Sequence, residues 1–475
     1  MKYLAYQLDK SSAQPLYLQL YQQIKDAIHQ GKLVQGEVLP SKRQLCEYLK
    51  ISQNTVENCY SQLLAEGYIE SKPRVGYFVT TQLLPINVSI NQISHQSIRE
   101  QQMSWRYDFN PNVIDERQFP FDKWKKIQKH FFTRQYAYLL SLGDKQGELN
   151  LRQQIAEYLR SARGVECSAE QIVINAGVEL CLIQLMLLWQ HRYPNQQAQY
   201  AMEEFGYPVV EKLWQSYAHQ VLKLPIDNQT LKVDLTVLSE HDIDLLYITP
   251  SHQYPFASVL SVNERQQLLS WASQKTGRYL IEDDYDSEFR YQGKPIPALK
   301  SLDQHDKVIY LGSFSKLMMP SIRISFMVLP ESLLHSYRQA INFFNPSVSR
   351  LDQNVLADFM AQGQFEKHIN RMRKHYRRKM DVLCQYLKQY AGKIRFFGES
   401  SGFYLLIELL DESRSIGELT ELATQQQIKV YPIHFYHRRL FVLGFGNFTE
   451  KELLEGIEAL CQCWQNKKAY SVGTE

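Results

Sequence analysis

The chain has 475 residues, of which 44% are hydrophobic and 22% charged, and this composition excludes a disordered protein. Its length predicts two or three domains rather than one. The formal net charge of +3 excludes a basic surface over the whole molecule, so any surface that attracts nucleic acid must be local.

Cysteines and apolar runs bear on the compartment. Seven scattered cysteines without zinc-binding spacing predict a reducing environment and no metal site. No run of eighteen apolar residues occurs, and the first residues lack the apolar segment of a signal peptide. We therefore expect a cytoplasmic protein with no membrane partner.

The first 80 residues show the pattern of three helices and a hairpin. Apolar residues recur at helical spacing between residues 16 and 28, and Gly31 follows as a stop. Ser41 and Ser52 each precede a short helical pattern and are suited to be N-caps. Residues 68–80 alternate in character around Gly76, which predicts a hairpin. This order predicts a winged helix-turn-helix domain over residues 1–80.

In such a domain, the second helix of the pair enters the major groove with its first residues at the base edges. Gln and Asn side chains suit adenine, and side chains at the preceding helix start and in the hairpin can hold phosphates. The residues that we expect to contact double-stranded operator DNA are Ser41, Lys42, Arg43, Gln53, Asn54, Thr55, Lys72 and Arg74. A small helical docking module is the alternative, because basic residues barely outnumber acidic ones over residues 1–80.

The rest of the chain has a different pattern. Residues 81–104 are polar, rich in glutamine and without a sustained period, and we interpret them as a linker. From residue 105 to residue 475, helical patterns alternate with short apolar runs, namely "QIVINAG", "AQYAMEE", "DLLYITP", "RYLIEDDY", "KVIYLGS" and "RISFMVL". This alternation predicts an α/β domain with a mainly parallel sheet.

Lys316 lies in a serine-rich turn between two of these runs, and Arg323 follows seven residues later. A lysine amine can form a Schiff base with an aldehyde cofactor if burial makes it lose its proton readily. Pyridoxal 5'-phosphate (PLP) also needs a phosphate cradle and a carboxylate beside its pyridine nitrogen. Ser313, Ser315 and Arg323 carry groups that suit the phosphate. A surface lysine in a loop is the alternative interpretation of Lys316 alone.

Two further segments complete this candidate site. "NAGVEL" predicts a strand-to-helix turn where the free amides of Gly177, Val178 and Glu179 can bind phosphate. Asp283 ends an apolar strand and would face the ligand crevice of an open sheet, where its carboxylate can hold the pyridine nitrogen. Tyr285 follows two residues later and can donate to the phenolic oxygen. Each feature alone has an ordinary alternative, such as a solvated acidic turn, so the prediction depends on their combination.

Several segments carry a resemblance to known families. "PLYLQLYQQIKDAI", "GEVLPSKRQLCEYLKISQNTVENCYSQLLAEGYIE" and "RVGYFV" resemble the winged helix-turn-helix of the GntR family. "EEFGYP", "TPSHQYP", "IEDDYDSEFRY" and "LGSFSKLMMPSIRISFMVLP" resemble fold type I aminotransferases, specifically those fused to a GntR domain in MocR-type regulators. The resemblance implies a fold type I PLP-dependent aminotransferase-like domain with a smaller C-terminal α/β subdomain, and a homodimer that we expect to be head-to-tail.

The resemblance also implies roles for single residues. Lys316 resembles the lysine that carries PLP, and Asp283 resembles the partner of the pyridine nitrogen. Tyr285 and Tyr254 resemble the partners of the phenolic oxygen, and Tyr207 resembles the aromatic residue that stacks on the ring. For Tyr207 and Tyr254, simple packing is the alternative. The residues that resemble the phosphate ligands are Ser313, Ser315 and Arg323.

The sequence departs from this resemblance at several positions. Val442 stands where aminotransferases carry the arginine that holds the substrate carboxylate, and Val209 stands where relatives responsive to γ-aminobutyrate carry a second arginine. Arg438 lies an even number of residues before Val442, so in a strand it would point to the same face and could bind an effector. Phe256 replaces a usual threonine and would crowd the pocket mouth. The departures in the N-terminal domain are Lys42 for a serine and Gln53 for an arginine.

A DNA reader joined to a PLP pocket predicts a transcriptional regulator whose effector is PLP or a small amino compound. Such an effector must bind two arrangements of the dimer with different affinity if it is to alter DNA binding. The pocket keeps the PLP ligands but lacks the usual amino-acid clamps, which favours sensing over fast transamination and leaves weak transamination open. The alternatives are an active PLP-dependent aminotransferase with an appended DNA-binding domain and a scaffold that binds no cofactor.

Overall fold

The computed structural model of the chain describes residues 6–80, 104–217, 220–293 and 296–465. The chain divides into two compact units, Met1–Met103 and Ser104–Glu475, and each is described by itself. The linker expected over residues 81–104 lies outside the described residues except for Ser104. In the parts that the structure describes, no helix is both long enough and apolar enough to cross a membrane.

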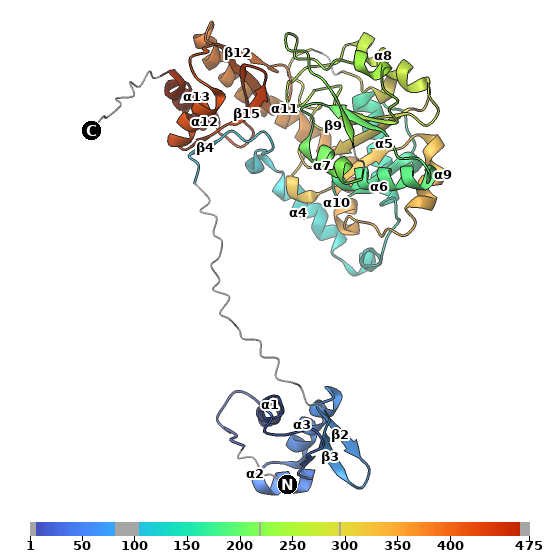
Figure 1. Ribbon diagram of the computed structural model, residues 1–475, viewed down its shortest axis with the longest axis vertical. Coiled ribbons are helices and arrows are strands. Elements are labelled where there is room, and N and C mark those ends of the chain that lie inside the picture. Colours follow the sequence, from blue (N-terminus) through green and yellow to red (C-terminus); the bar gives the residue numbers. More distant parts are fainter. Residues whose placement is uncertain (1–5, 81–103, 218–219, 294–295, 466–475) are drawn as a thin grey trace, which may run out of the picture. The chain divides into compact units, whose positions relative to one another are not determined.

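The N-terminal unit consists of three helices and a small antiparallel sheet (Figure 1). Its strands pair in the order β1-β3-β2. The core includes Leu20 and Ile24 of the first helix and Val56 and Leu63 of the third, all without exposed surface. The predicted winged helix-turn-helix is therefore confirmed. Its elements are α1 (Leu16–His29), β1 (Val38–Leu39), α2 (Lys42–Leu49), α3 (Gln53–Ala65), β2 (Ile69–Lys72) and β3 (Gly76–Val79).

Both predicted N-caps of this unit are present. The Ser41 hydroxyl accepts a hydrogen bond from the Gln44 amide, and the Gln44 side chain accepts one from the Ser41 amide. The Ser52 hydroxyl accepts a hydrogen bond from the Thr55 amide. Each cap satisfies an N–H group that has no partner inside its helix, which fixes the first residues of α2 and α3.

The large unit is built on a seven-stranded sheet with the strand order β5-β11-β10-β9-β8-β6-β7. Neighbouring strands run parallel except for β11, which is antiparallel to both β5 and β10. The six predicted runs all contain strands, whereas the edge strand β7 is not predicted because Lys223 interrupts its short apolar run. The strands are β5 (Ile172–Asn175), β6 (Tyr200–Glu203), β7 (Val221–Leu224), β8 (Leu245–Ile248), β9 (Tyr279–Asp284), β10 (Val308–Ser313) and β11 (Ser325–Val328).

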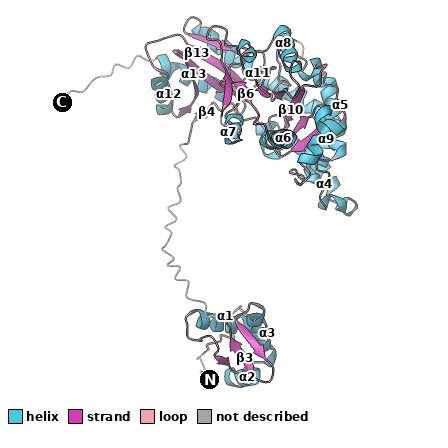
Figure 2. Ribbon diagram, turned by 45° about the vertical axis from the view of Figure 1, so that its right-hand side comes forward, coloured by secondary structure: helices cyan, strands magenta, loops and turns pink. Residues whose placement is uncertain are grey.

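Helices lie on both faces of this sheet (Figure 2). Tyr279 and Ile281 of β9 pack in one apolar cluster with side chains of α6, α7 and α9. Leu280, between them, packs in another cluster with side chains of α8. Both faces of the strand are therefore apolar, as parallel sheets covered by crossover helices require. The helices are α4 (Phe121–Phe131), α5 (Leu149–Arg163), α6 (Val178–Arg192), α7 (Pro208–Tyr217), α8 (Val262–Ser273), α9 (Glu331–Ala340) and α10 (Arg350–Ala361).

A smaller α/β subdomain completes the large unit, as the fold class predicts. Its antiparallel sheet has the order β12-β13-β16-β15, and α11 (Gln364–Leu387) packs against both α10 and the last helix, α13. The strand β4 (Tyr107–Asp108) pairs with β14 (Ile428–Lys429), so the beginning of this unit joins the subdomain. The remaining elements are β12 (Ile394–Phe397), β13 (Tyr404–Leu409), α12 (Ile416–Gln425), β15 (Tyr431–Phe435), β16 (Arg438–Gly444), α13 (Glu450–Gln465), and the 3-10 helices η1 (Glu116–Gln118), η2 (Arg134–Leu140), η3 (Ala169–Gln171), η4 (Thr236–Ser239), η5 (Lys300–Leu302), η6 (Pro320–Ile322) and η7 (Lys388–Tyr390).

Candidate functional site

A cavity of about 130 Å³ lies at the carboxyl ends of the central strands of the large sheet, where open α/β sheets bind ligands. Most residues expected to bind PLP line this cavity, and Gly177 lies beside it, against Arg323. The expected residues in the lining are Val178, Glu179, Tyr207, Tyr254, Asp283, Tyr285, Ser313, Ser315, Lys316 and Arg323. Lining residues that the sequence did not indicate are Asn112, Tyr247, Thr249 and Ser325.

The connection between β10 and β11 positions Lys316. Its ends are fixed because Ser313 and Ser325 pair across the two strands and their hydroxyls are joined by a hydrogen bond of 2.9 Å. The Ser315 amide also donates to the Ser313 hydroxyl over 3.2 Å. The turn that carries Lys316 is therefore held in a defined shape next to the sheet.

The amine of Lys316 has the environment of a reactive lysine. Its Nζ lies 4.6 Å from the centre of the Tyr285 ring. Burial lowers the pKa of the amine, while the carboxylates of Asp286 and Asp283 oppose the effect. A lowered pKa favours the neutral amine, which is the form that reacts with an aldehyde.

Asp283 is the penultimate residue of β9, and its carboxylate is buried in the cavity wall. Burial raises the pKa of Asp283 to about 6. The Tyr247 hydroxyl, which projects from the neighbouring strand β8, donates a hydrogen bond to the carboxylate and lowers this pKa. Asp283 thus titrates near neutral pH, and at higher pH it offers a buried negative charge to a protonated ring nitrogen.

Three tyrosines form much of the remaining wall. The Tyr285 hydroxyl lies 3.3 Å from the Tyr404 hydroxyl and 3.2 Å from Nδ1 of His252. Tyr254 packs edge-on against the Tyr404 ring, with ring centres 5.9 Å apart. Burial raises the pKa of Tyr207, Tyr254 and Tyr285, so each hydroxyl remains a hydrogen-bond donor at neutral pH.

The opposite end of the cavity is suited to an anion. Arg323 adopts a positive φ of 50°, and its guanidinium donates to the Glu179 carboxylate over 2.8 Å. Gly177 has a φ of 102°, and a Cβ at this position would collide with the Arg323 guanidinium, so only glycine fits. Val178 begins α6, where the first amides of a helix have no partner inside it. The Ser315 hydroxyl is buried and has no hydrogen-bond partner among the described residues.

These groups together fit a compound with three features. An aldehyde would meet the Lys316 amine, a protonated ring nitrogen would meet the Asp283 carboxylate, and an anionic tail would meet Arg323. The buried Ser315 hydroxyl fits the anionic end in particular, because it has no partner among the described residues and could donate a hydrogen bond to an oxygen of that end.

Two expectations about the pocket do not agree with the structure. The Arg438 guanidinium forms two hydrogen bonds to the Glu408 carboxylate, of 2.6 and 2.7 Å, and Arg438 does not line the cavity. Its charge is therefore neutralised, which removes the reason for expecting an effector contact. Phe256 does not crowd the cavity mouth, because it is buried against Phe205 and Phe435.

In the N-terminal unit, the residues expected at base edges begin α3. Gln53 and Asn54 are exposed, whereas Thr55 is half-buried and its hydroxyl lies 2.8 Å from that of Ser52. Two polar side chains are thus free to meet DNA, and the third also supports the helix start. Ser41 is exposed in its role as the N-cap of α2.

The residues expected to contact phosphate differ in their exposure and in the ion pairs that they form within the unit. Lys42 donates to the Glu57 carboxylate over 2.6 Å, so it is engaged within the unit. The Arg43 side chain is 90% exposed, although it reaches Glu47 on the next turn of α2. In the hairpin, Lys72 at the end of β2 pairs with Glu70, and Arg74 in the turn is exposed with a φ of 64°.

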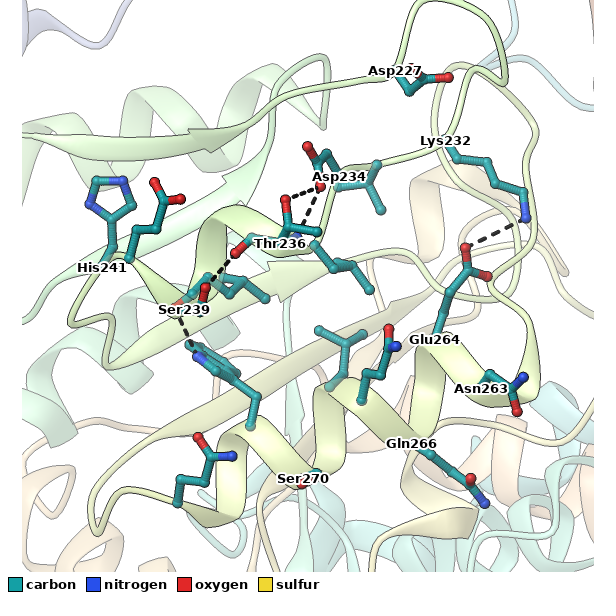
Figure 3. A pocket seen from close by; sticks show the side chains of 18 of the residues that line it. Asp227, Lys232, Asp234, Thr236, Ser239, His241, Asn263, Glu264, Gln266 and Ser270 are labelled. Carbon is teal, nitrogen blue, oxygen red and sulfur yellow. Dashed lines mark hydrogen bonds and ion pairs between the residues drawn. The ribbon is translucent and has the colours of Figure 1, made fainter.

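A larger and more open hollow, of about 1470 Å³, lies between the segment around η4 and helix α8 (Figure 3). Some of its polar side chains pair with one another. The Thr236 hydroxyl donates to Asp234 over 2.7 Å, and Lys232 pairs with Glu264 at 3.5 Å. Over the residues that the structure describes, no group of three or more His, Cys, Asp or Glu side chains could hold a metal ion. The chemistry therefore points to the smaller cavity around Lys316.

Comparison with known proteins agrees with both units. Residues 16–79 match the family described as bacterial regulatory proteins, gntR family, and residues 108–460 match aminotransferase class I and II. The chain is 30% identical to the probable rhizopine catabolism regulatory protein MocR of Rhizobium meliloti, over 95% of this chain and 94% of that one. The chain belongs to the MocR-type transcriptional regulators.

Other HTH-type transcriptional regulators are similarly close. An uncharacterized HTH-type transcriptional regulator of Bacillus subtilis, YdeL, is 38% identical over 95% of this chain and 97% of its own length. The HTH-type pyridoxine biosynthesis transcriptional regulator PdxR of Corynebacterium glutamicum is 30% identical over 77% of each chain. The function predicted from the sequence, a DNA-binding transcriptional regulator with an aminotransferase-like domain, is therefore confirmed.

Solved structures agree on the fold of the large unit of this MocR-type regulator. The kynurenine aminotransferase of Pyrococcus horikoshii superposes with a TM-score of 0.65 at 23% identity, over 76% of this chain and 91% of that one. An archaeal alanine:glyoxylate aminotransferase gives a TM-score of 0.66 at 21% identity, over 76% and 91%. At these sequence identities, the likeness shows that the large unit has the fold of these aminotransferases and shows nothing about its activity.

Proposed function

We propose that this MocR-type regulator binds PLP in the cavity around Lys316, and that PLP, alone or with a small amino compound, changes its affinity for operator DNA. The observation that carries the proposal is the convergence of an amine, a carboxylate and a guanidinium in one cavity, from Lys316, Asp283 and Arg323. The name of the relative PdxR refers to regulation of pyridoxine biosynthesis, which supports a vitamin B6 compound as the effector.

Each part of the cavity would have a role in this function. Lys316 is the amine that would hold the cofactor, and Asp283 would keep a proton on the ring nitrogen. When bound, PLP supplies an aldehyde that reacts reversibly with amines, which is a basis for sensing an amino compound. The residues that would bind the phosphate are Gly177, Val178 and Glu179 through the start of α6, together with Ser313, Ser315 and Arg323. The residues that would cover the ring and reach its phenolic oxygen are Tyr207, Tyr254 and Tyr285.

The cavity favours sensing over rapid turnover. Among the lining residues that the structure describes, Lys316 and Arg323 are the cationic ones, and both are assigned to the cofactor. Val442 is 2% exposed in an apolar cluster of the core. An amino acid that entered the site would find little to hold its carboxylate, so we expect transamination to be slow.

Reading two half-sites requires two DNA-binding domains, and we propose a homodimer with head-to-tail contacts. The region after α4 carries apolar side chains that face solvent, with Phe132 73%, Leu140 90% and Leu142 74% exposed. A soluble monomer rarely exposes such a group of apolar side chains, and an interface would cover it. The two symmetric DNA-binding domains would then read repeated or palindromic half-sites.

The test is to replace Lys316 by Ala in the full-length protein. Lys451→Ala, on the exposed face of α13, is the matched control. We expect wild type and the control to develop a visible absorption band with PLP and, after borohydride reduction, a mass adduct on the peptide that contains Lys316. We expect Lys316→Ala to show neither.

The same proteins test the regulatory part of the proposal. The affinity for DNA, selected from random duplexes with the full-length protein, would be measured with and without PLP by fluorescence anisotropy. We expect PLP to change the affinity of wild type and the control, and not that of Lys316→Ala. An equal response of Lys316→Ala and wild type would reject PLP sensing at this cavity.

A further inference from the structure

Glu179 places a negative charge at the end of the cavity that is suited to an anion. Its carboxylate accepts a hydrogen bond from the Arg323 guanidinium over 2.8 Å. The side chains are partly exposed, 36% for Glu179 and 50% for Arg323, so the pair lies at the cavity rim and not in the core. Arg323 is the sole guanidinium among the lining residues that the structure describes.

Local structure favours this position of the Glu179 carboxylate. Glu179 is the second residue of α6, and a carboxylate in the first turn of a helix is stabilised by the helix dipole. The missing side chain at Gly177 leaves the space that the pair occupies, because a Cβ there would collide with both the guanidinium and the carboxylate. The two positive features at this end, Arg323 and the start of α6, are therefore already balanced by a negative charge of the chain.

A ligand phosphate needs the same two features. A phosphate that approached Arg323 would meet the Glu179 carboxylate within a few ångströms, and like charges so placed repel each other. Val178 has no polar side-chain atom, and the hydroxyls of Ser313 and Ser315 carry no charge. None of these side chains can therefore offset the repulsion between the phosphate and the Glu179 carboxylate. The phosphate can take its full set of contacts only if the carboxylate turns away from Arg323.

We infer that Glu179 is an affinity-determining residue whose carboxylate competes with the ligand's phosphate for Arg323. The inference rests on the proposed binding of PLP. Competition of this kind lowers the apparent affinity, because only the fraction of molecules with Arg323 free can bind the phosphate. Weaker binding makes occupancy follow the concentration of the free cofactor, which suits a sensor better than a permanently loaded enzyme.

The experiment compares PLP with pyridoxal, which has the same aldehyde and ring but no phosphate. Both are titrated into full-length wild type and Glu179→Gln, and binding is followed by absorbance. Glu170→Gln is the matched control, because Glu170 also pairs with an exposed arginine, Arg338, outside the cavity. The Gln side chain is nearly the same size as Glu and is partly exposed here, so folding should be retained, and thermal unfolding checks this.

We expect Glu179→Gln to bind PLP roughly five- to ten-fold more tightly than wild type, since a competing surface ion pair and a like-charge repulsion are both removed. We expect its affinity for pyridoxal to stay within about two-fold of wild type, because pyridoxal does not use Arg323. We expect Glu170→Gln to match wild type for both compounds.

The possible failures are distinguishable. If wild type binds neither compound, the proposed function fails and this inference falls with it. If wild type binds PLP but Glu179→Gln binds it equally or more weakly, Glu179 is not a competitor and only this inference is overturned. An equal gain for PLP and pyridoxal would also overturn it, because the effect would not act through the phosphate.

Discussion

At the scale of single residues, the charge of Asp283 depends on one neighbour, Tyr247. Burial favours the protonated carboxyl and raises the pKa of Asp283 to about 6, while the hydrogen bond from Tyr247 favours the carboxylate and lowers it. The carboxylate must be charged to hold a proton on a ring nitrogen. Cofactor binding should therefore weaken as the pH falls through the pKa of Asp283.

This dependence gives a prediction for Tyr247→Phe. Removing the hydroxyl removes a hydrogen bond to the charged form, so the pKa of Asp283 rises further. We expect the acid limb of PLP affinity to move upward by roughly one to two pH units, since a hydrogen bond to a charged group is worth about 1.5–3 kcal/mol and one pKa unit corresponds to about 1.4 kcal/mol. The measurement is PLP affinity from pH 5 to pH 8.

The control for that experiment is Tyr200→Phe, which removes a buried hydroxyl from β6 outside the cavity lining. We expect its acid limb to coincide with that of wild type. A midpoint that stays in place or moves downward in Tyr247→Phe would show that Tyr247 does not tune Asp283.

The sequence could predict the residues of the cavity that follow a local pattern. Asp283 stands at the end of one apolar run and Lys316 in the turn that follows another, and strand ends of an open sheet face its ligand crevice. Tyr247 and Thr249 had a weaker signal, because they lie two residues apart at the end of β8 and so can share a face. Asn112 had no signal, because it reaches the cavity from a distant part of the chain through the tertiary fold.

At the scale of elements, the starts of α2 and α3 decide which side chains the N-terminal unit offers to DNA. The caps at Ser41 and Ser52 fix both starts. Lys42 is held by Glu57, whereas Arg43 is highly exposed and its pair with Glu47 is of the surface kind that contributes little energy. Arg43 is therefore the more available phosphate contact of the two.

A salt titration tests this element. We expect Arg43→Ala to weaken binding to all DNA sequences alike and to reduce the slope of log affinity against log salt concentration by about one, because one phosphate contact is lost. The measurement is fluorescence anisotropy with random duplex DNA at several salt concentrations. The control is Arg377→Ala, an exposed arginine of α11 in the large unit. An unchanged slope would mean that Arg43 does not meet a phosphate.

The length of an element and its pattern of apolar residues decide whether it can be predicted from the sequence. The helix α1 has a clear apolar stripe, and Leu20, Ile24, Ala27 and Ile28 are buried as its period predicts. The strand β1 has two residues and takes its identity from pairing with β3, so no local pattern reveals it. The run in β13 is buried at every position, and such a run cannot be told from a buried helix by its period.

At the scale of the whole molecule, the chain divides into two compact units. The interface proposed for the homodimer could not be located from the sequence, because the apolar side chains that face solvent belong to a region without a strong motif. Leu140 and Leu142 lie at and just after the end of η2, and their exposure becomes visible only once the fold is known. The α4 region lies at the periphery of its unit (Figure 1).

The proposed homodimer predicts the effect of Leu140→Glu. A charge at a side chain that is 90% exposed should not disturb the core, but it should disfavour an apolar interface. We expect the dimer dissociation constant to rise roughly ten-fold or more. Sedimentation velocity over a range of protein concentrations measures it. The control is Leu454→Glu, on an exposed position of α13, and equal effects of the two substitutions would count against this interface.

The antiparallel strand β11 has a consequence for selectivity. Ser313 and Ser325 hold in register the two ends of one short connection, and this connection carries both Lys316 and Arg323. In the proposed site, a ligand must place its carbonyl at the Lys316 amine and its acidic group at the Arg323 guanidinium at the same time. A compound in which these two groups are too close together or too far apart can reach only one of the two side chains, whatever the shape of the rest of the molecule.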